Sequence, residues 1–117
     1  MEPKKIIYVD FDWTICDTPF QHNMDEGSQY SKDTPHYARI DVINDLYDKG
    51  HNITYWTARG CVSGDDFTEL TRNQLEEWGC KYHHLEVGTK PHFDMYICDK
   101  SFNSESFFHY KESRLPW

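Results

Sequence analysis

The chain has 117 residues, of which 38% are hydrophobic and 16% aromatic, so we expect one globular domain over residues 1–117 rather than a disordered chain. Its net charge of −8, from 20 acidic against 12 basic side chains, argues against a broad nucleic-acid-binding or membrane-binding surface. No apolar stretch is long enough for an export signal or a membrane span. We therefore expect a cytoplasmic protein with no membrane partner and with its four cysteines as free thiols.

The first predicted element is a short apolar strand that ends in two carboxylates. Residues 6–9 read Ile-Ile-Tyr-Val, which is typical of a strand buried on both faces of a parallel sheet. Asp10 and Asp12 follow at once, at the edge where open α/β sheets bind their ligands. The two acids converge only if the chain turns after Asp10, and oxygen ligands of this kind favour Mg²⁺. The alternative is a solvated acid pair with no cation.

A polar, irregular stretch over residues 16–36 follows the acid pair. It predicts an excursion over the end of the first strand, in part a hairpin or flap, with Phe20 and Tyr30 as candidate anchors. Loops of this length in small domains are usually functional, although a mobile surface loop is the alternative.

A helix and a second strand come next. Thr34 and Pro35 predict the helix start, as a hydroxyl cap followed by proline at the first helical position, and Gly50 predicts its end. A strand over Asn52–Trp56 then ends in Thr57. A strand, a helix and a strand in this order imply a right-handed parallel crossover, which places Thr57 at the same sheet edge as the acid pair.

The rest of the chain predicts one more helix, two more strands and a short terminal helix. Lys90 lies in the turn between the two strands, and Asp99 stands at the end of the last one. The predicted bounds are Ser63 to Gly79 for the helix, Tyr82–Val87 and Asp94–Cys98 for the strands, and about Glu105–Lys111 for the terminal helix.

Together, the strand ends predict a site that suits a phosphomonoester. One carboxylate can attack phosphorus, and Mg²⁺ offsets the repulsion between that anion and the phosphate. Thr57 and Lys90 would bind the remaining phosphoryl oxygens, and a second acid would protonate the leaving alkoxide and then activate water.

The chain resembles the haloacid dehalogenase-like superfamily of phosphohydrolases over roughly residues 5–104. The superfamily's D-x-D-x-T signature after an apolar strand is the most specific of its four motifs. The matching positions, from the first motif to the fourth, are residues 10–14, then Thr57 followed by Ala58 and Arg59, then Lys90, and finally Asp99.

The resemblance implies a fold and a set of roles. The fold would be an α/β, Rossmann-like three-layer sandwich with a mostly parallel sheet of about four strands in the order 3-2-1-4, with a flap over about residues 16–36 and no cap domain. Asp10 would be the nucleophile and a Mg²⁺ ligand, and Asp12 the general acid and base, with its main-chain carbonyl on the metal. Thr57 and Lys90 would bind the phosphoryl group, with Asp99 as a further metal ligand.

This sequence departs from the superfamily pattern at two positions. Trp13 stands where many relatives have glycine, and its ring could crowd the turn or stack on a substrate sugar or base. Cys98 replaces a second acid beside Asp99, which predicts a weaker metal site. Two further residues, Ala58 and Arg59, are candidates for substrate contact, with an exposed or helix-capping arginine as the alternative.

We therefore expect a Mg²⁺-dependent phosphomonoester hydrolase that works through an aspartyl phosphate on a small phosphorylated metabolite such as a sugar phosphate. A nucleotide or polynucleotide phosphatase of the same superfamily is one alternative. A receiver-like phospho-acceptor module is another, but its accepting position would fall near Asp48, at a helix end rather than a strand end. A site without a cap suits bulky esters, or a homo-oligomer whose second subunit covers it.

Overall fold

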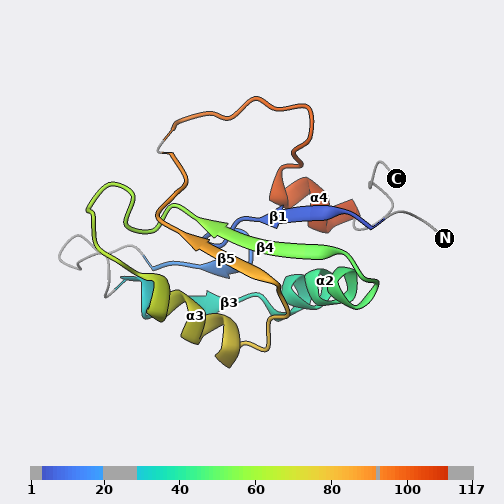
Figure 1. Cartoon of the computed structure of the whole chain (residues 1–117), viewed down its shortest axis with the longest axis horizontal. Coiled ribbons are helices and arrows are strands. Elements are labelled where there is room, and N and C mark those ends of the chain that lie inside the picture. The colour runs from blue at the N-terminus through green and yellow to red at the C-terminus, as the bar shows by residue number, and fades with distance from the viewer. Residues whose placement is uncertain (1–3, 20–28, 92, 111–117) are drawn as a thin grey trace.

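Three parallel strands form the central sheet. In the computed structural model, which describes residues 4–19, 29–91 and 93–110, they are β1 (Ile6–Val9), β4 (Asn52–Thr57) and β5 (His84–Val87), in the order β1-β4-β5. The register pairs Val9 with Tyr55 and Thr57 with Val87. The carboxyl ends of the strands therefore meet at one edge of the sheet (Figure 1). The α/β class, the parallel crossover and the order of the first three predicted strands are confirmed.

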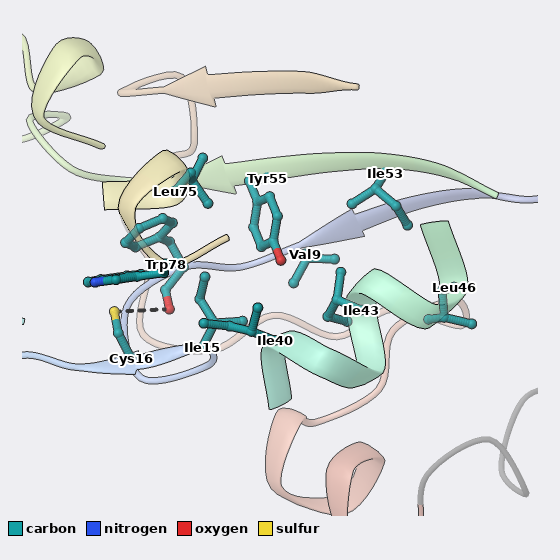
Figure 2. Packing of buried hydrophobic residues seen from close by; sticks show 11 residues of the cluster. Val9, Ile15, Cys16, Ile40, Ile43, Leu46, Ile53, Tyr55, Leu75 and Trp78 are labelled. Atoms are coloured by element: carbon teal, nitrogen blue, oxygen red, sulfur yellow. Dashed lines mark hydrogen bonds between the residues drawn. The ribbon is translucent and has the colours of Figure 1, made fainter. Parts of the chain in front are cut away.

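Helices cover one face of this sheet. α2 (Tyr37–Asp48) and α3 (Thr68–Glu77) pack their apolar sides against alternate strand residues, and α4 (Ser104–Tyr110) adds Phe107 and Phe108 to the same core. Figure 2 shows the strand side chains pointing toward the helices. The core that they share comprises Val9, Phe11, Ile15, Cys16, Ile40, Ile43, Leu46, Ile53, Tyr55, Leu75 and Trp78.

The opposite face of the sheet carries exposed side chains. Ile6 is 77% exposed, and Tyr8, His84 and Glu86 are exposed as well. Because alternate residues of a strand point to opposite faces, these four lie on the side away from the core. Helices therefore cover only one face in the described part of the chain. The predicted three-layer sandwich is wrong there, and the sheet is one of two layers.

The predicted fourth strand, Asp94–Cys98, is not formed. Residues 93–103 contain no strand and make a long arc between β5 and α4 (Figure 1). Ile97, at the centre of the predicted strand, is 89% exposed. Residue types that favour strands are not sufficient, because a strand also needs the main chain of a neighbour to bond to. The sheet therefore has three strands, and β1 lies at its edge.

A two-stranded hairpin base stands where the flap was predicted. β2 (Cys16–Asp17) pairs antiparallel with β3 (Thr34–Pro35), and the His36 N–H donates to the Ile15 carbonyl at 2.8 Å. Thr34 and Pro35 are therefore strand residues, and α2 begins only at Tyr37, so the predicted helix start is wrong. Pairing with β2 keeps these two residues extended, although their types favour the start of a helix. Phe20 and the rest of residues 20–28 lie outside the described residues.

The second helix also begins later than predicted. Residues 61–67 form turns and irregular structure, and α3 starts at Thr68, whose N–H donates to Asp66 Oδ1 at 2.9 Å. The conformation of this loop requires glycine at position 60, because the φ of +82° is left-handed and a Cβ there would meet the Asp65 carbonyl oxygen at 2.0 Å. In the described ranges, no helix has the length and apolar character needed to cross a membrane.

A pair of isoleucines on opposite faces tests the two-layer sheet. Ile53→Ala should lower the free energy of unfolding by about 2–4 kcal/mol, because Ile53 is fully buried against the helices. Ile6→Ala, the matched control on the open face, should change it by less than about 0.5 kcal/mol. Urea denaturation of both variants measures the difference, and equal losses would contradict a sheet that is covered on one side.

Candidate active site

Asp10 stands where β1 ends, and the chain turns immediately after it. The N–H groups of Thr14 and Ile15 both donate to the Phe11 carbonyl, at 3.2 and 3.0 Å, which closes a tight turn. Trp13 occupies this turn with a φ of +64°, a left-handed conformation that is strained for a bulky residue. The turn after Asp10 that convergence of the acid pair requires is therefore present, and Trp13 lies 60% exposed at its tip.

The carboxylate of Asp10 meets a lysine from far along the chain. Lys90 Nζ lies 3.1 Å from Asp10 Oδ1, and Thr14 Oγ1 donates to Asp10 Oδ2 at 3.2 Å. The Asp10 side chain remains 42% exposed, so solvent or a ligand can still reach it. The ammonium group of Lys90 also lies 5.4 Å from the centre of the Trp56 ring. Two predicted site residues are thus in direct contact at the open edge of the sheet.

Thr57 and Ala58 lie at the same edge, where Ala58 is half-buried and its carbonyl accepts from the Cys61 N–H at 2.9 Å. Thr57 ends β4 and follows Tyr55, the partner of Val9, by two residues. Its side chain is buried, and its Oγ1 accepts a hydrogen bond from the Arg59 N–H at 3.2 Å. In this bond the hydroxyl acts only as an acceptor, so its own proton can be donated to another group.

Asp12 points into a different environment from Asp10. Arg59 Nε lies 3.0 Å from Asp12 Oδ2, and Arg59 Nη2 lies 2.8 Å from Oδ1. Thr18 Oγ1 also donates to Oδ1, at 3.1 Å. Arg59 itself is only 1% exposed. The predicted alternatives for this arginine were substrate contact, exposure or helix capping, and the structure instead buries it in an ion pair with Asp12.

The other side of the Arg59 guanidinium meets residues that no sequence motif indicated. Its Nη2 pairs with Asp33, and its Nη1 donates to Thr71 Oγ1 at 3.0 Å and Gln74 Oε1 at 2.7 Å. Asp33 belongs to the end of the flap, and Thr71 and Gln74 belong to α3. The one available signal was that Thr71 and Gln74 are polar residues spaced by three on the buried side of a helix.

Burial and charge alter two titrating groups in this cluster. Burial, together with the charge of Asp12, raises the pKa of Asp33 to about 7, and Arg59 only partly opposes the shift. Burial and the same two carboxylates raise the pKa of the Cys16 thiol well above its ordinary value. Cys16 is therefore a protonated thiol that donates to Asp33 Oδ2 at 3.3 Å, and not a nucleophile.

Two groups of residues are candidates for metal ligands. Asp12, Cys16 and Asp33 bring their ligand atoms within 4.8 Å of one another, but both carboxylates already pair with Arg59 and the thiol holds its proton. The Asp10 carboxylate is more accessible to a hydrated Mg²⁺, which keeps several waters and binds through one or two carboxylates, although its Oδ1 already pairs with Lys90. Asp99 lies exposed in the arc after β5, and no described contact joins it to Asp10 or Asp12. A site with three carboxylates is therefore not assembled among the described residues.

The comparisons with known proteins bear on the fold. No protein-family model matches the chain, and no curated protein sequence matches it. Its structure is similar to the crystal structure of a structural-genomics target from Vibrio cholerae, with a TM-score of 0.72 and 22% sequence identity over 91% of this chain and 88% of that chain. At this level of identity the similarity concerns the fold alone, and it agrees with a small α/β domain built on a parallel sheet.

The raised pKa of Asp33 predicts how stability changes with pH. Because the pKa of this carboxyl is higher in the folded chain than in the unfolded one, its contribution favours folding below about pH 4 and is lost as the pH rises to about 7. Asp33→Asn removes the titration. The free energy of unfolding of the wild type should therefore fall relative to that of Asp33→Asn between pH 4 and pH 7. Denaturation at a series of pH values measures this difference, and a rising or flat difference would contradict it.

Proposed function

We propose that the protein is a Mg²⁺-dependent phosphomonoester hydrolase that works through an aspartyl phosphate on Asp10. One observation carries the proposal: at the carboxyl edge of the sheet, the exposed Asp10 carboxylate lies 3.1 Å from Lys90 Nζ. A carboxylate is the nucleophile of such a reaction, and an ammonium group beside it attracts the phosphate and stabilises charge on the transferring group. Thr57, at the adjacent strand end, adds a hydroxyl donor.

In the first half-reaction, an Asp10 oxygen forms a bond to phosphorus as the bond to the leaving oxygen breaks. Lys90 and Thr57 donate to the phosphoryl oxygens and hold the group in line for attack. When bound, Mg²⁺ would clamp a phosphoryl oxygen and offset its repulsion from the nucleophile. Asp12 gives its proton to the leaving alkoxide, which departs as an alcohol.

In the second half-reaction, Asp12 accepts a proton from water. The water oxygen then bonds to phosphorus, the bond to Asp10 breaks, and inorganic phosphate leaves. Asp10 is restored as a carboxylate, and Asp12 is left protonated for the next turnover. The same residue thus serves as acid and then as base, and this requires that it be held beside the reacting group in both steps.

The surroundings of the site favour a small phosphorylated substrate with a flat or ring-shaped face. Trp13 presents an exposed ring directly after Asp12, where it could stack on a sugar or a base. A small phosphorylated metabolite such as a sugar phosphate fits this arrangement. The receiver-like alternative is less well supported, because Asp48 lies at the end of α2 and pairs with Lys81 at 2.9 Å instead of standing at a strand end.

Removal of the nucleophile tests the proposal. Asp10→Asn should lower turnover of 4-nitrophenyl phosphate in excess Mg²⁺ by more than about 10³-fold, because an amide does not form the phosphoenzyme. The wild type, quenched in acid during turnover of a ³²P-labelled ester, should retain label on the peptide that contains Asp10. Addition of EDTA should abolish both turnover and labelling.

A surface aspartate supplies the matched control. Asp41→Asn, on the exposed side of α2, makes the same change in charge and should leave turnover and labelling unchanged. Equal activity of Asp10→Asn and Asp41→Asn would contradict the assignment of Asp10. An active wild type with no acid-stable label would instead argue for direct attack by water.

A further inference from the structure

We infer that Arg59 is a positioning residue that holds the general acid, Asp12, with its Oδ2 atom directed to the reaction. This inference rests on the proposed phosphatase activity, because Asp12 has a chemical role only in that reaction. It concerns a residue that sequence motifs suggested as a substrate contact, and whose side chain is fully buried in the structure. A group without exposed surface acts on a substrate only through a neighbour.

The contacts between Arg59 and Asp12 fix the plane of the carboxylate. Nε and Nη2 donate to the two Asp12 oxygens at 3.0 and 2.8 Å, which is the two-point geometry that an arginine fork provides. A lysine, as a single point charge, would leave the carboxylate free to rotate. The side chain of Asp12 therefore has one defined orientation, although it remains 18% exposed.

The two oxygens of Asp12 are not equivalent. Oδ1 accepts from Arg59 Nη2 and from Thr18 Oγ1, at 2.8 and 3.1 Å, so both of its lone pairs are engaged. Oδ2 accepts from Nε at 3.0 Å and from neither Nη2 nor Thr18, so Arg59 and Thr18 engage it less than Oδ1. We therefore assign the transferable proton to Oδ2.

Hydrogen bonds and aromatic rings also hold the guanidinium in place. Thr71 and Gln74 of α3 accept from Nη1, and the guanidinium carbon lies 4.3 and 4.4 Å from the ring centres of Phe11 and Tyr30. Tyr30 is in turn bonded through its carbonyl to Gln74 Nε2 at 2.6 Å. A rigid arginine therefore transmits the position of α3 and of the flap to the acid.

A leaving-group comparison isolates this role. When Asp10 attacks phosphorus, the proton of Asp12 Oδ2 moves to the leaving oxygen as the phosphorus–oxygen bond breaks. A 4-nitrophenolate is stable as an anion and leaves without this proton, whereas an alkoxide does not. The ratio kcat/KM reports the first chemical step. Misplacement of Asp12 should therefore lower kcat/KM for an alkyl phosphate and leave kcat/KM for the aryl phosphate unchanged.

Arg59→Lys is the direct variant. It should lower kcat/KM for a simple alkyl phosphate by about 10–100-fold and change that for 4-nitrophenyl phosphate by less than about threefold. Asp12→Asn should show the same selectivity with a larger loss. If Arg59→Lys does not fold, Thr71→Val decides the question, because it removes one anchor of the guanidinium and leaves every charge in place. Its loss should be smaller and equally selective for the alkyl ester.

Leu75→Ala is the matched structural control. Leu75 is buried one turn after Thr71 on α3 and is an apolar residue of the core, so its loss lowers stability without removing a contact of the guanidinium. It should change the two kcat/KM values by the same factor.

An equal loss for both esters in Arg59→Lys and in Thr71→Val would overturn the positioning role. If the wild type hydrolysed neither ester, the proposed function would fail, and the inference with it. Selectivity in Asp12→Asn but not in the Arg59 and Thr71 variants would overturn the inference alone.

Discussion

The buried guanidinium of Arg59 is the interaction on which the arrangement of the site depends. It joins four separate parts of the chain: the turn after β1 through Asp12, the end of β4 through its own main chain, the flap through Asp33, and α3 through Thr71 and Gln74. A buried ion pair of this kind adds little net stability, because desolvation of the charges offsets their attraction. Its effect is to restrict geometry, because each partner left without the arginine would be a buried and uncompensated polar group.

The site therefore has two regions with different physical character. Asp10 and Lys90 lie at the open edge, where water screens their charges and a ligand can exchange with solvent. Asp12 lies at the boundary of the buried cluster, where Arg59 holds its orientation and its side chain is 18% exposed. A nucleophile must be reached by substrate, whereas an acid must be aimed at it. The division of the two aspartates between these regions is the one that the proposed reaction would require.

The one-sided packing of the sheet has a consequence for the site. β1 lies at the edge of a sheet that helices cover on one face, and Asp10 and Trp13, which follow this strand, are 42% and 60% exposed. The arc over residues 93–103 passes outside the sheet (Figure 1). It carries exposed apolar side chains. The edge that carries Asp10 thus stays accessible because no further strand pairs with β1 in the described part of the chain.

Local sequence patterns were sufficient to predict part of this structure. The apolar run before Asp10, the parallel crossover to Thr57 and the helix ends at Gly50 and Gly79 could be predicted, because each depends on a few neighbouring residues. The same reasoning placed Lys90 at the edge that Asp10 occupies, because parallel strands end on the same side.

Only the tertiary structure decided the environment of Arg59, the participation of Asp33 and the absence of a strand over Asp94–Cys98. Each of these depends on partners that are distant in sequence: a guanidinium is buried only where carboxylates and rings surround it, and a strand forms only where another backbone accepts it. Pro35 is a further example, because its residue type favours the start of a helix but its pairing with Cys16 makes it part of a strand. Residue types thus determined which chemical groups were available at the sheet edge, and long-range packing determined which of them face solvent and which are held in place.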